Sequence, residues 1–181
     1  MIFPEKQVQL KDGRTAVLRG PTIDDAAVLL DYLKVTSGET PFLIRYPEEC
    51  TETMEQEIAF LKRSIDSATN MMILCMVDGK LAGNCALSRH DRIKTRHRAD
   101  VAIALKQEFW GLGIGTIMFE EMIASARDLG ISQLELEVID GNQRAMGLYQ
   151  KMGFEIVATH PNAICLKDGT ILAEHVMIKK L

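Results

Sequence analysis

The sequence predicts an α+β fold, in which a mixed, mainly antiparallel sheet is flanked by helices. Three Asp-Gly pairs, beginning at Asp12, Asp78 and Asp168, each lie between strand-like runs, a pattern typical of β-hairpins. Four helical segments alternate with these runs, which favours helices packed on a sheet. A chain of 181 residues is long enough to bury a sizeable core. We therefore expect one domain over residues 1–181.

The first half of the chain predicts two hairpins with two helices between them. The strands of these hairpins span residues 7–10, 15–19, 71–77 and 81–87. Each helix begins with a threonine and an acidic or amide residue three positions later, which is a capping signal. The two pairs are Thr22 with Asp25 and Thr53 with Gln56, and the helices run to about Lys34 and Ser67.

The second half adds a strand, a helix, a strand, a helix and a last hairpin. These elements cover residues 99–105, 117–129, 133–138, 143–152, 163–166 and 170–178. Asn142 is a suitable N-cap for the fourth helix, and Gly153 is a suitable residue to close it in the left-handed conformation. The resulting order is β-β-α-α-β-β-β-α-β-α-β-β.

The run Trp-Gly-Leu-Gly-Ile-Gly-Thr at residues 110–116 lies between a predicted strand and a predicted helix. Glycines without Cβ atoms let a backbone approach a ligand closely. The helix N-terminus offers N–H groups and a positive dipole end, which suit phosphate. The alternative is a tight turn that needs glycine for its φ angles. The spacing fits neither a Rossmann fingerprint nor a P-loop, because no third glycine or lysine follows at the required place.

The next fifty residues carry a second, more specific pattern. An alternating strand at 133–138 precedes Asn142, Tyr149 lies two helical turns further on, and Gly153-Phe154 follows. Over roughly residues 98–157 this combination resembles the GCN5-related N-acetyltransferase (GNAT) family. Members of that family transfer acetyl from acetyl-CoA to an amine. Outside that stretch the resemblance rests on the order of elements.

The resemblance implies roles for particular residues. Backbone N–H groups of the glycine loop would hold the coenzyme pyrophosphate, the preceding strand would pair with the pantetheine arm and polarise the thioester carbonyl, and a helical asparagine would contact the pantetheine. A tyrosine would protonate the leaving thiolate. In this chain the loop residues are Gly111, Leu112, Gly113, Ile114, Gly115 and Thr116, the strand residues are Ile103, Ala104 and Leu105, and the helical residues are Asn142 and Tyr149. Trp110 departs from the usual Gln or Arg, and we expect it to be mainly structural.

The chemistry also needs a group that accepts a proton. An amine of lysine type has a pKa near 10.4, so only about one molecule in a thousand is neutral at pH 7. The candidate bases are Asp100 and His97, followed by His90 and Glu39. Members of the family also move the proton through water. Glu39 lies where the family's substrate-facing loop falls, so we expect it to bind a cationic acceptor.

Composition narrows the function further. Lys and Arg number 21 against 25 Asp and Glu, a net charge of −4, which argues against a general nucleic-acid binder. We expect no membrane span, no signal peptide and no metal site. Cys75 and Cys85 lie in apolar runs, which favours buried thiols in a reducing cytoplasm. Residues 89–98 carry five Lys and Arg; they form either a solvated loop or a dock for an acidic partner.

The sequence therefore predicts an acetyl-CoA-dependent N-acetyltransferase that uses no metal. We expect direct transfer to a primary amine, most simply of a small molecule, through a ternary complex. The alternatives are an enzyme that acts on a protein or peptide, and a non-catalytic acyl-CoA-binding module of the same fold. Homodimers are common in the family, so a homodimer is possible here.

Overall fold

The computed structural model describes residues 1–181 and has one eight-stranded sheet, in the order β1-β2-β3-β4-β5-β6-β8-β7. Strands β5 and β6 pair in parallel, whereas β1–β2, β2–β3, β3–β4, β6–β8 and β7–β8 pair antiparallel. The expected mixed, mainly antiparallel sheet is confirmed. The strands are β1 (Lys6–Gln9), β2 (Thr15–Arg19), β3 (Asn70–Val77), β4 (Lys80–Arg89), β5 (Arg98–Leu105), β6 (Gln133–Ile139), β7 (Glu155–Cys165) and β8 (Ile171–Lys180).

Four α-helices and three single 3-10 turns accompany the sheet. The helices are α1 (Ala26–Glu39), α2 (Met54–Asp66), α3 (Ile114–Asp128) and α4 (Gln143–Lys151), and the turns are η1 (Ile23–Asp25), η2 (Pro47–Glu49) and η3 (Gln107–Phe109). The chain divides into two compact units. The first contains Met1–Ser88 and Ala102–Met118, and the second contains Arg89–Val101 and Phe119–Leu181.

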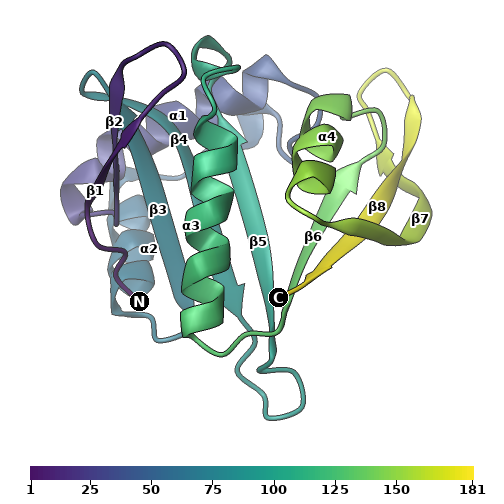
Figure 1. Ribbon diagram of the computed structural model, residues 1–181. Helices are drawn as coiled ribbons and strands as arrows, with labels where there is room; N and C mark the ends of the chain where they lie inside the picture. Colours follow the sequence, from purple (N-terminus) through teal and green to yellow (C-terminus); the bar gives the residue numbers. More distant parts are fainter. The chain divides into compact units, whose positions relative to one another are not determined.

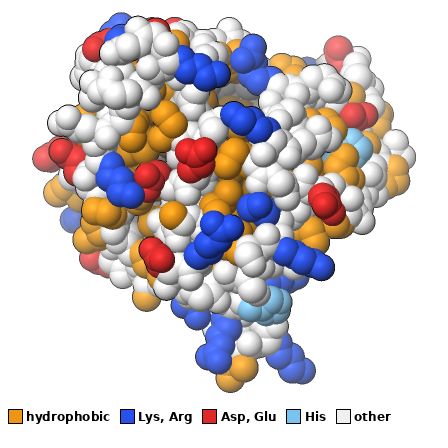
Figure 2. Space-filling view, viewed as in Figure 1, with side chains coloured by type: hydrophobic (Ala, Val, Ile, Leu, Met, Phe, Trp, Pro, Cys, Tyr) orange, Lys and Arg blue, Asp and Glu red, His pale blue; other side chains and the backbone are white.

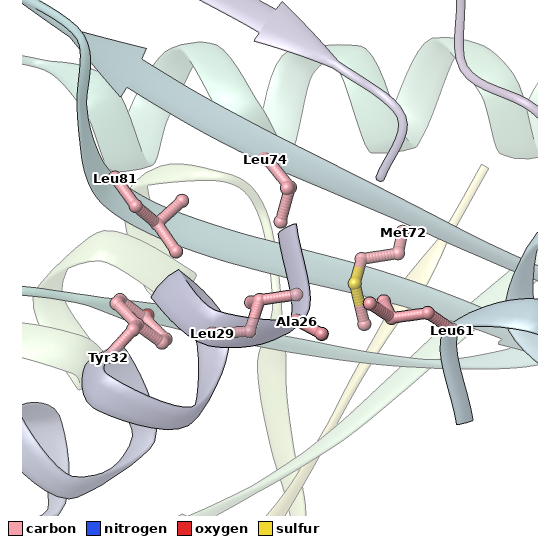
Figure 3. Packing of buried hydrophobic residues seen from close by; sticks show 7 residues of the cluster. All are labelled: Ala26, Leu29, Tyr32, Leu61, Met72, Leu74 and Leu81. Carbon is pink, nitrogen blue, oxygen red and sulfur yellow. The ribbon is translucent and has the colours of Figure 1, made fainter. Parts of the chain in front are cut away.

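In the first unit, α1 and α2 lie together on one face of strands β2–β4 (Figure 1). Their inward side chains and those of β3 and β4 point toward one another and form a buried cluster (Figure 3). The cluster consists of Ala26, Leu29, Tyr32, Leu61, Met72, Leu74 and Leu81. Burial of this apolar surface is the main force that holds the two helices on the sheet.

Both predicted capping boxes are present, but that of Thr22 caps η1, and α1 ends later than predicted. Thr53 Oγ1 accepts from Gln56 N at 3.3 Å, and Gln56 Oε1 accepts from Thr53 N at 2.8 Å, a complete capping box. The Thr22 box precedes η1, and α1 then continues to Glu39 instead of Lys34. The extra turn can be buried because the hydroxyl of Thr36 donates to the Tyr32 carbonyl at 2.8 Å.

The second unit contains the β6–β8–β7 ladder with α4 and most of α3. Strand β7 begins at Glu155, eight residues before the predicted start. The local signal was weak because Pro161 and Asn162 interrupt the strand: Asn162 has φ +55° and the register shifts between His160 and Ile164. Such an interruption is a β-bulge, which sequence alternation does not predict.

The basic run forms the protruding loop between β4 and β5. Figure 2 shows Lys and Arg side chains gathered over this loop. Its charged side chains are exposed or half-buried, and Ile93 is 80% exposed. This exposure agrees with both interpretations of the sequence, a solvated loop and a dock for an acidic partner.

Candidate functional site

The glycine loop leads directly into α3. Gly111 and Gly113 have φ of +82° and +89°, so these two positions require glycine, whereas Gly115 is helical. Helix α3 begins at Ile114, three residues before the predicted start, and its first turn therefore begins inside the glycine run. The N–H groups of a first turn have no intrahelical partner and can bind an anion.

Lys11 borders this loop and was not found by sequence reasoning. Its N–H donates to the Leu112 carbonyl at 3.2 Å, and a Cβ added at Gly113 would lie 3.4 Å from Lys11 Cγ and Cε. The aliphatic stem of the exposed Lys11 side chain thus packs over Gly113. An ammonium beside a helix N-terminus adds to the attraction for phosphate. About 100 residues of chain separate the two segments, so no local pattern indicated the contact.

The end of β5 is held from three sides. Tyr32 Oη donates to the Ala104 carbonyl at 2.6 Å, and Trp110 Nε1 donates to the Leu105 carbonyl at 2.9 Å. Lys106 N donates to the Ala82 carbonyl at 2.9 Å. The expected structural role of Trp110 agrees with this contact, because its indole closes the turn between β5 and the glycine loop.

Gly83 explains how β4 and β5 come so close. A Cβ at this position would lie 2.7 Å from the Ala104 carbonyl oxygen and 2.1 Å from Leu105 Cδ2. The side chain of any other residue would therefore push the two strands apart. Tyr32 and Gly83 were missed because their partners are remote in the sequence.

The hydroxyl of Tyr32 fixes one particular peptide group. Its oxygen also accepts from Asn84 N at 3.3 Å, and burial raises the pKa of Tyr32 above its ordinary value. The phenol therefore stays protonated and keeps donating to Ala104. The Ala104 carbonyl and the Leu105 N–H belong to the same planar trans peptide and point in opposite directions. Tyr32 thus sets the direction of the Leu105 N–H.

Glu39, the expected acceptor-binding residue, ends α1 and contacts the segment after β5. Its Oε2 accepts from Gln107 N at 2.8 Å, and the Gln107 side chain donates to the Glu39 carbonyl. The carboxylate therefore acts as an N-terminal cap of η3.

In the second unit, Tyr149 is buried at the inner face of α4. Its side chain packs edge-on against Phe119 with ring centroids 5.5 Å apart, and it also contacts Phe154 at 6.2 Å. The residue is 8% exposed, and burial raises the pKa of Tyr149 to about 12. The phenol is thus a proton donor over the whole neutral range.

Asn142 is the N-cap of α4, as predicted. Its Oδ1 accepts from Ala145 N at 3.2 Å. The side-chain oxygen is thereby used within the helix, and the NH₂ group is the part of Asn142 that can donate to a ligand. Gly153 has φ +85° and follows α4, which confirms its predicted closing role.

Two of the candidate bases lie together. His90 Nε2 contacts Asp100 Oδ2 at 3.1 Å, and Arg98 donates to His90 Nδ1 at 3.4 Å. Because Arg98 donates to Nδ1, the proton of neutral His90 is on Nε2 and points to Asp100. His97 is exposed, and its carbonyl accepts from Ser132 N and Gln133 N rather than from this pair.

A further polar chain was missed entirely. Thr159 Oγ1 and His175 Nδ1 lie 2.9 Å apart, and His175 Nε2 lies 3.4 Å from Asp140 Oδ1. Asp140 comes two residues before Asn142, so this chain supports the turn that begins α4. Thr159 lies in β7, His175 in β8 and Asp140 directly after β6, so only the strand register brings them together.

The cysteines do not resemble nucleophiles. Cys50, Cys75 and Cys85 are buried, as expected for the last two, and Cys165 is exposed. Burial raises the pKa of Cys75 to about 12 and that of Cys85 even further, so both stay protonated thiols. No three His, Cys, Asp or Glu side chains gather as metal ligands. None of the helices combines the length and the apolar character that crossing a bilayer requires.

Comparison with known proteins identifies the family. Residues 38–154 match the model of the acetyltransferase (GNAT) family. L-amino acid N-acetyltransferase AaaT of Escherichia coli is 27% identical over 119 residues, 65% of this chain and 73% of that protein. Thialysine N-epsilon-acetyltransferase of Bos taurus is 45% identical over 73 residues, 40% of this chain and 43% of that protein.

Solved structures agree with the sequence matches. The crystal structure of a GNAT-family acetyltransferase from Streptococcus pneumoniae has a TM-score of 0.86 at 30% identity, over 92% of this chain and 99% of that chain. A Salmonella typhimurium protein described as a putative acetyltransferase with its cofactor acetyl-CoA has a TM-score of 0.77 at 17% identity, over 92% of this chain and 94% of that chain, and shares the fold. The chain belongs to the acetyltransferase (GNAT) family.

Proposed function

We propose that this chain transfers the acetyl group of acetyl-CoA directly to a primary amine of a small molecule, through a ternary complex. The observation that carries the proposal is the glycine loop, with left-handed Gly111 and Gly113 at the start of α3 and Lys11 packed against it. Two relatives are named for acceptors that are amino acids or lysine-like amines. These names favour a small acceptor with an aliphatic amine.

The coenzyme would be held by backbone groups together with the side chains of Lys11 and Asn142. Residues 111–116 and Lys11 would bind the pyrophosphate, residues 103–105 would pair with the pantetheine arm, and the NH₂ group of Asn142 would donate to it. The Leu105 N–H, whose direction Tyr32 sets, would donate to the developing oxyanion. A donor that is fixed before the reaction stabilises that charge without reorganisation.

The amine nitrogen attacks the thioester carbonyl, a C–N bond forms and the C–S bond breaks. The amine proton passes to a base, for which we propose Asp100, assisted by His90, with His97 as the other candidate; water can carry the proton. Tyr149 gives a proton to the leaving thiolate, and its raised pKa keeps that proton available at neutral pH.

No cysteine takes part in this scheme. Transfer through an acyl-cysteine would need a thiolate, and burial holds Cys75 and Cys85 in the thiol form. Three of the four cysteines are buried and free, which suits a reducing compartment, and we propose the cytoplasm.

The test is thiol release from acetyl-CoA with a panel of acceptors, and coenzyme binding measured by calorimetry in parallel. The panel contains amino acids, thialysine and other diamines, polyamines, aminoglycosides, aryl amines and short peptides. Turnover on an amino acid or a diamine supports the proposal. Turnover on peptides alone supports the protein-modifying alternative. Binding of acetyl-CoA without turnover on any amine supports a non-catalytic module, and absence of binding contradicts all three.

A further inference from the structure

Helix α1 holds the segment that leaves β5 at several successive positions. These contacts all lie within the first unit and involve the helix face that carries Tyr32 and Glu39, two helical turns apart. They are Tyr32 Oη to the Ala104 carbonyl at 2.6 Å, Asp31 Oδ2 to Lys106 Nζ at 3.6 Å, and Glu39 Oε2 to Gln107 N at 2.8 Å. The helix and the end of β5 thus form one connected frame.

Of these contacts, the one between Glu39 and Gln107 can transmit a conformational change between the segment after β5 and the end of α1. It is reciprocal: the Glu39 carboxylate accepts from the Gln107 backbone, and the Gln107 side chain donates to the Glu39 backbone. A hydrogen bond to a carboxylate is about twice as strong as a neutral one. The Asp31–Lys106 pair, by contrast, has a carboxylate with a side chain 69% exposed, so it adds little.

The Glu39–Gln107 contact joins two segments that lie next to the proposed substrate sites. Glu39 is the last residue of α1 and lies where the family resemblance expects the substrate-facing loop; residues 40–50 follow it, and we take them as the rest of that loop. Gln107 opens η3, four residues before Gly111 of the coenzyme loop. Residues 40–50 also return to α1, where Cys50 Sγ lies 3.6 Å from Ser37 Oγ. The Glu39–Gln107 contact is therefore a direct bridge between the two substrate segments.

We propose that Glu39 is a positioning residue that couples acetyl-CoA binding to the order of residues 40–50. The inference rests on the proposed function, in which residues 111–116 hold the coenzyme. A bound coenzyme restrains the loop and η3, and through Gln107 it restrains the end of α1 and the acceptor segment. The acceptor then binds to a segment that is already ordered. Coupling of this kind is reciprocal in binding free energy.

A pair of substitutions separates this role from a direct role of the carboxylate. Glu39→Gln keeps an oxygen that accepts from Gln107 N but removes the charge, whereas Glu39→Ala removes both. Asp24→Ala is the matched control, because Asp24 is an exposed carboxylate in η1, the short turn that leads into α1. Hydrogen exchange of residues 40–50 is measured with and without acetyl-CoA, together with the Kd of acetyl-CoA and the acceptor KM.

In the natural protein, Glu39→Gln and the control, acetyl-CoA should slow exchange in residues 40–50. In Glu39→Ala this protection should disappear while the Kd of acetyl-CoA changes by less than about threefold, and the acceptor KM should rise about tenfold, the usual effect of losing a charge-assisted hydrogen bond. If Glu39→Ala keeps the protection, the coupling is wrong. If Glu39→Gln raises the acceptor KM as much as Glu39→Ala, the charge itself binds the acceptor and the positioning role is wrong.

The same measurements distinguish failure of the proposed function from failure of this inference alone. If the natural protein does not bind acetyl-CoA, the proposed function and this inference fall together. If it binds acetyl-CoA and shows no protection in residues 40–50, only the inference falls.

Discussion

At the scale of single residues, Tyr149 combines an observed packing role with the proposed role of acid. Its ring is a core aromatic against Phe119 and Phe154, and its hydroxyl has the protonation state that an acid needs. The packing and the proposed chemistry use different parts of the side chain. They can therefore be separated by a substitution that keeps the ring.

Tyr149→Phe should lower kcat by roughly 100-fold, the lower end of the range for general acid catalysis. The Kd of acetyl-CoA should change little, because the phenyl ring fills the same space. Thiol-release kinetics and calorimetry measure the two quantities. Because the pKa of Tyr149 is about 12, the kcat of the natural protein should not decline between pH 7 and 9 through this group. An unchanged kcat in the variant removes Tyr149 as the acid.

Lys11 is the residue on which a phosphate site can be tested without disturbing the backbone. Lys11→Met keeps the stem against Gly113 and removes the ammonium. We expect the Kd of acetyl-CoA to rise about tenfold, as for loss of one charged hydrogen bond, and kcat to stay the same at saturation. The salt dependence of binding should weaken in the variant. Lys34→Met, at an exposed position of α1, is the control; equal effects in both would mean a general charge effect.

Tyr32 should act on the reaction through the Ala104–Leu105 peptide. Tyr32→Phe leaves the Ala104 carbonyl without its donor, so the Leu105 N–H is less firmly directed. We expect kcat to fall by about tenfold and stability by roughly 1–3 kcal/mol, since a buried partner is left unpaired. The infrared C=O stretch of bound, carbonyl-labelled acetyl-CoA should move back toward its value in water. A stretch that stays the same assigns Tyr32 to packing alone.

At the scale of elements, the sequence predicted correctly those helix ends that are determined by contacts within one turn. The capping box at Thr53, the N-cap at Asn142 and the left-handed Gly153 involve residues within one turn, and all are present. The end of α1 and the start of β7 were wrong because they depend on remote packing and on the bulge at Pro161. Tertiary contacts override propensity at such places.

In the candidate site, too, contacts between remote residues could not be predicted from local sequence. Backbone geometry of the glycine loop follows from glycine itself, and the positive φ values of Gly111 and Gly113 agree with it. The Glu39–Gln107 bridge joins residues 68 positions apart, so only the fold reveals it. The residues proposed for coenzyme binding and chemistry carry local sequence motifs, whereas the contacts that position them are visible only in the fold.

Helix α2 contains a carboxylate whose burial opposes stability. Burial, with a smaller effect of Glu52, raises the pKa of Glu57 above its ordinary value. A raised carboxyl pKa means that stability is largest below the unfolded pKa, about 4.3, and declines as pH rises through the folded pKa. Glu57→Gln should therefore be more stable than the natural protein at pH 7 and differ little from it at pH 4.

Urea unfolding at both pH values measures this difference. Glu55→Gln on the same helix is the matched control. The pKa of Glu55 is shifted in the opposite direction from that of Glu57, because hydrogen bonds to the backbone and to Thr53 lower it. That variant should gain nothing at pH 7. A Glu57→Gln protein that is less stable at pH 7 would mean that the charge of Glu57 is needed in the fold.

At the scale of the whole molecule, β4, β5 and α3 have residues in both compact units, although only Arg89 of β4 lies in the second. Residues of β5 up to Val101 lie in the second unit and the rest in the first, and α3 passes from the first unit into the second after Met118. Unfolding of either unit therefore breaks a strand and a helix of the other. This continuity predicts that residues 1–181 unfold as the single domain expected from the sequence.

Acetyl-CoA should then stabilise both units, although the glycine loop lies in the first alone. At a free concentration of 100 times its Kd, a ligand that binds only the folded state adds about 2.7 kcal/mol. For a chain of this size each kcal/mol raises Tm by about 2–4 °C, so the expected shift is roughly 5–11 °C. Calorimetry should show one transition that moves as a whole, and hydrogen exchange should slow in β3 and in β8 alike. Two transitions, of which acetyl-CoA moves only one, would show that the units unfold independently and that the shared strand and helix do not make them a single domain.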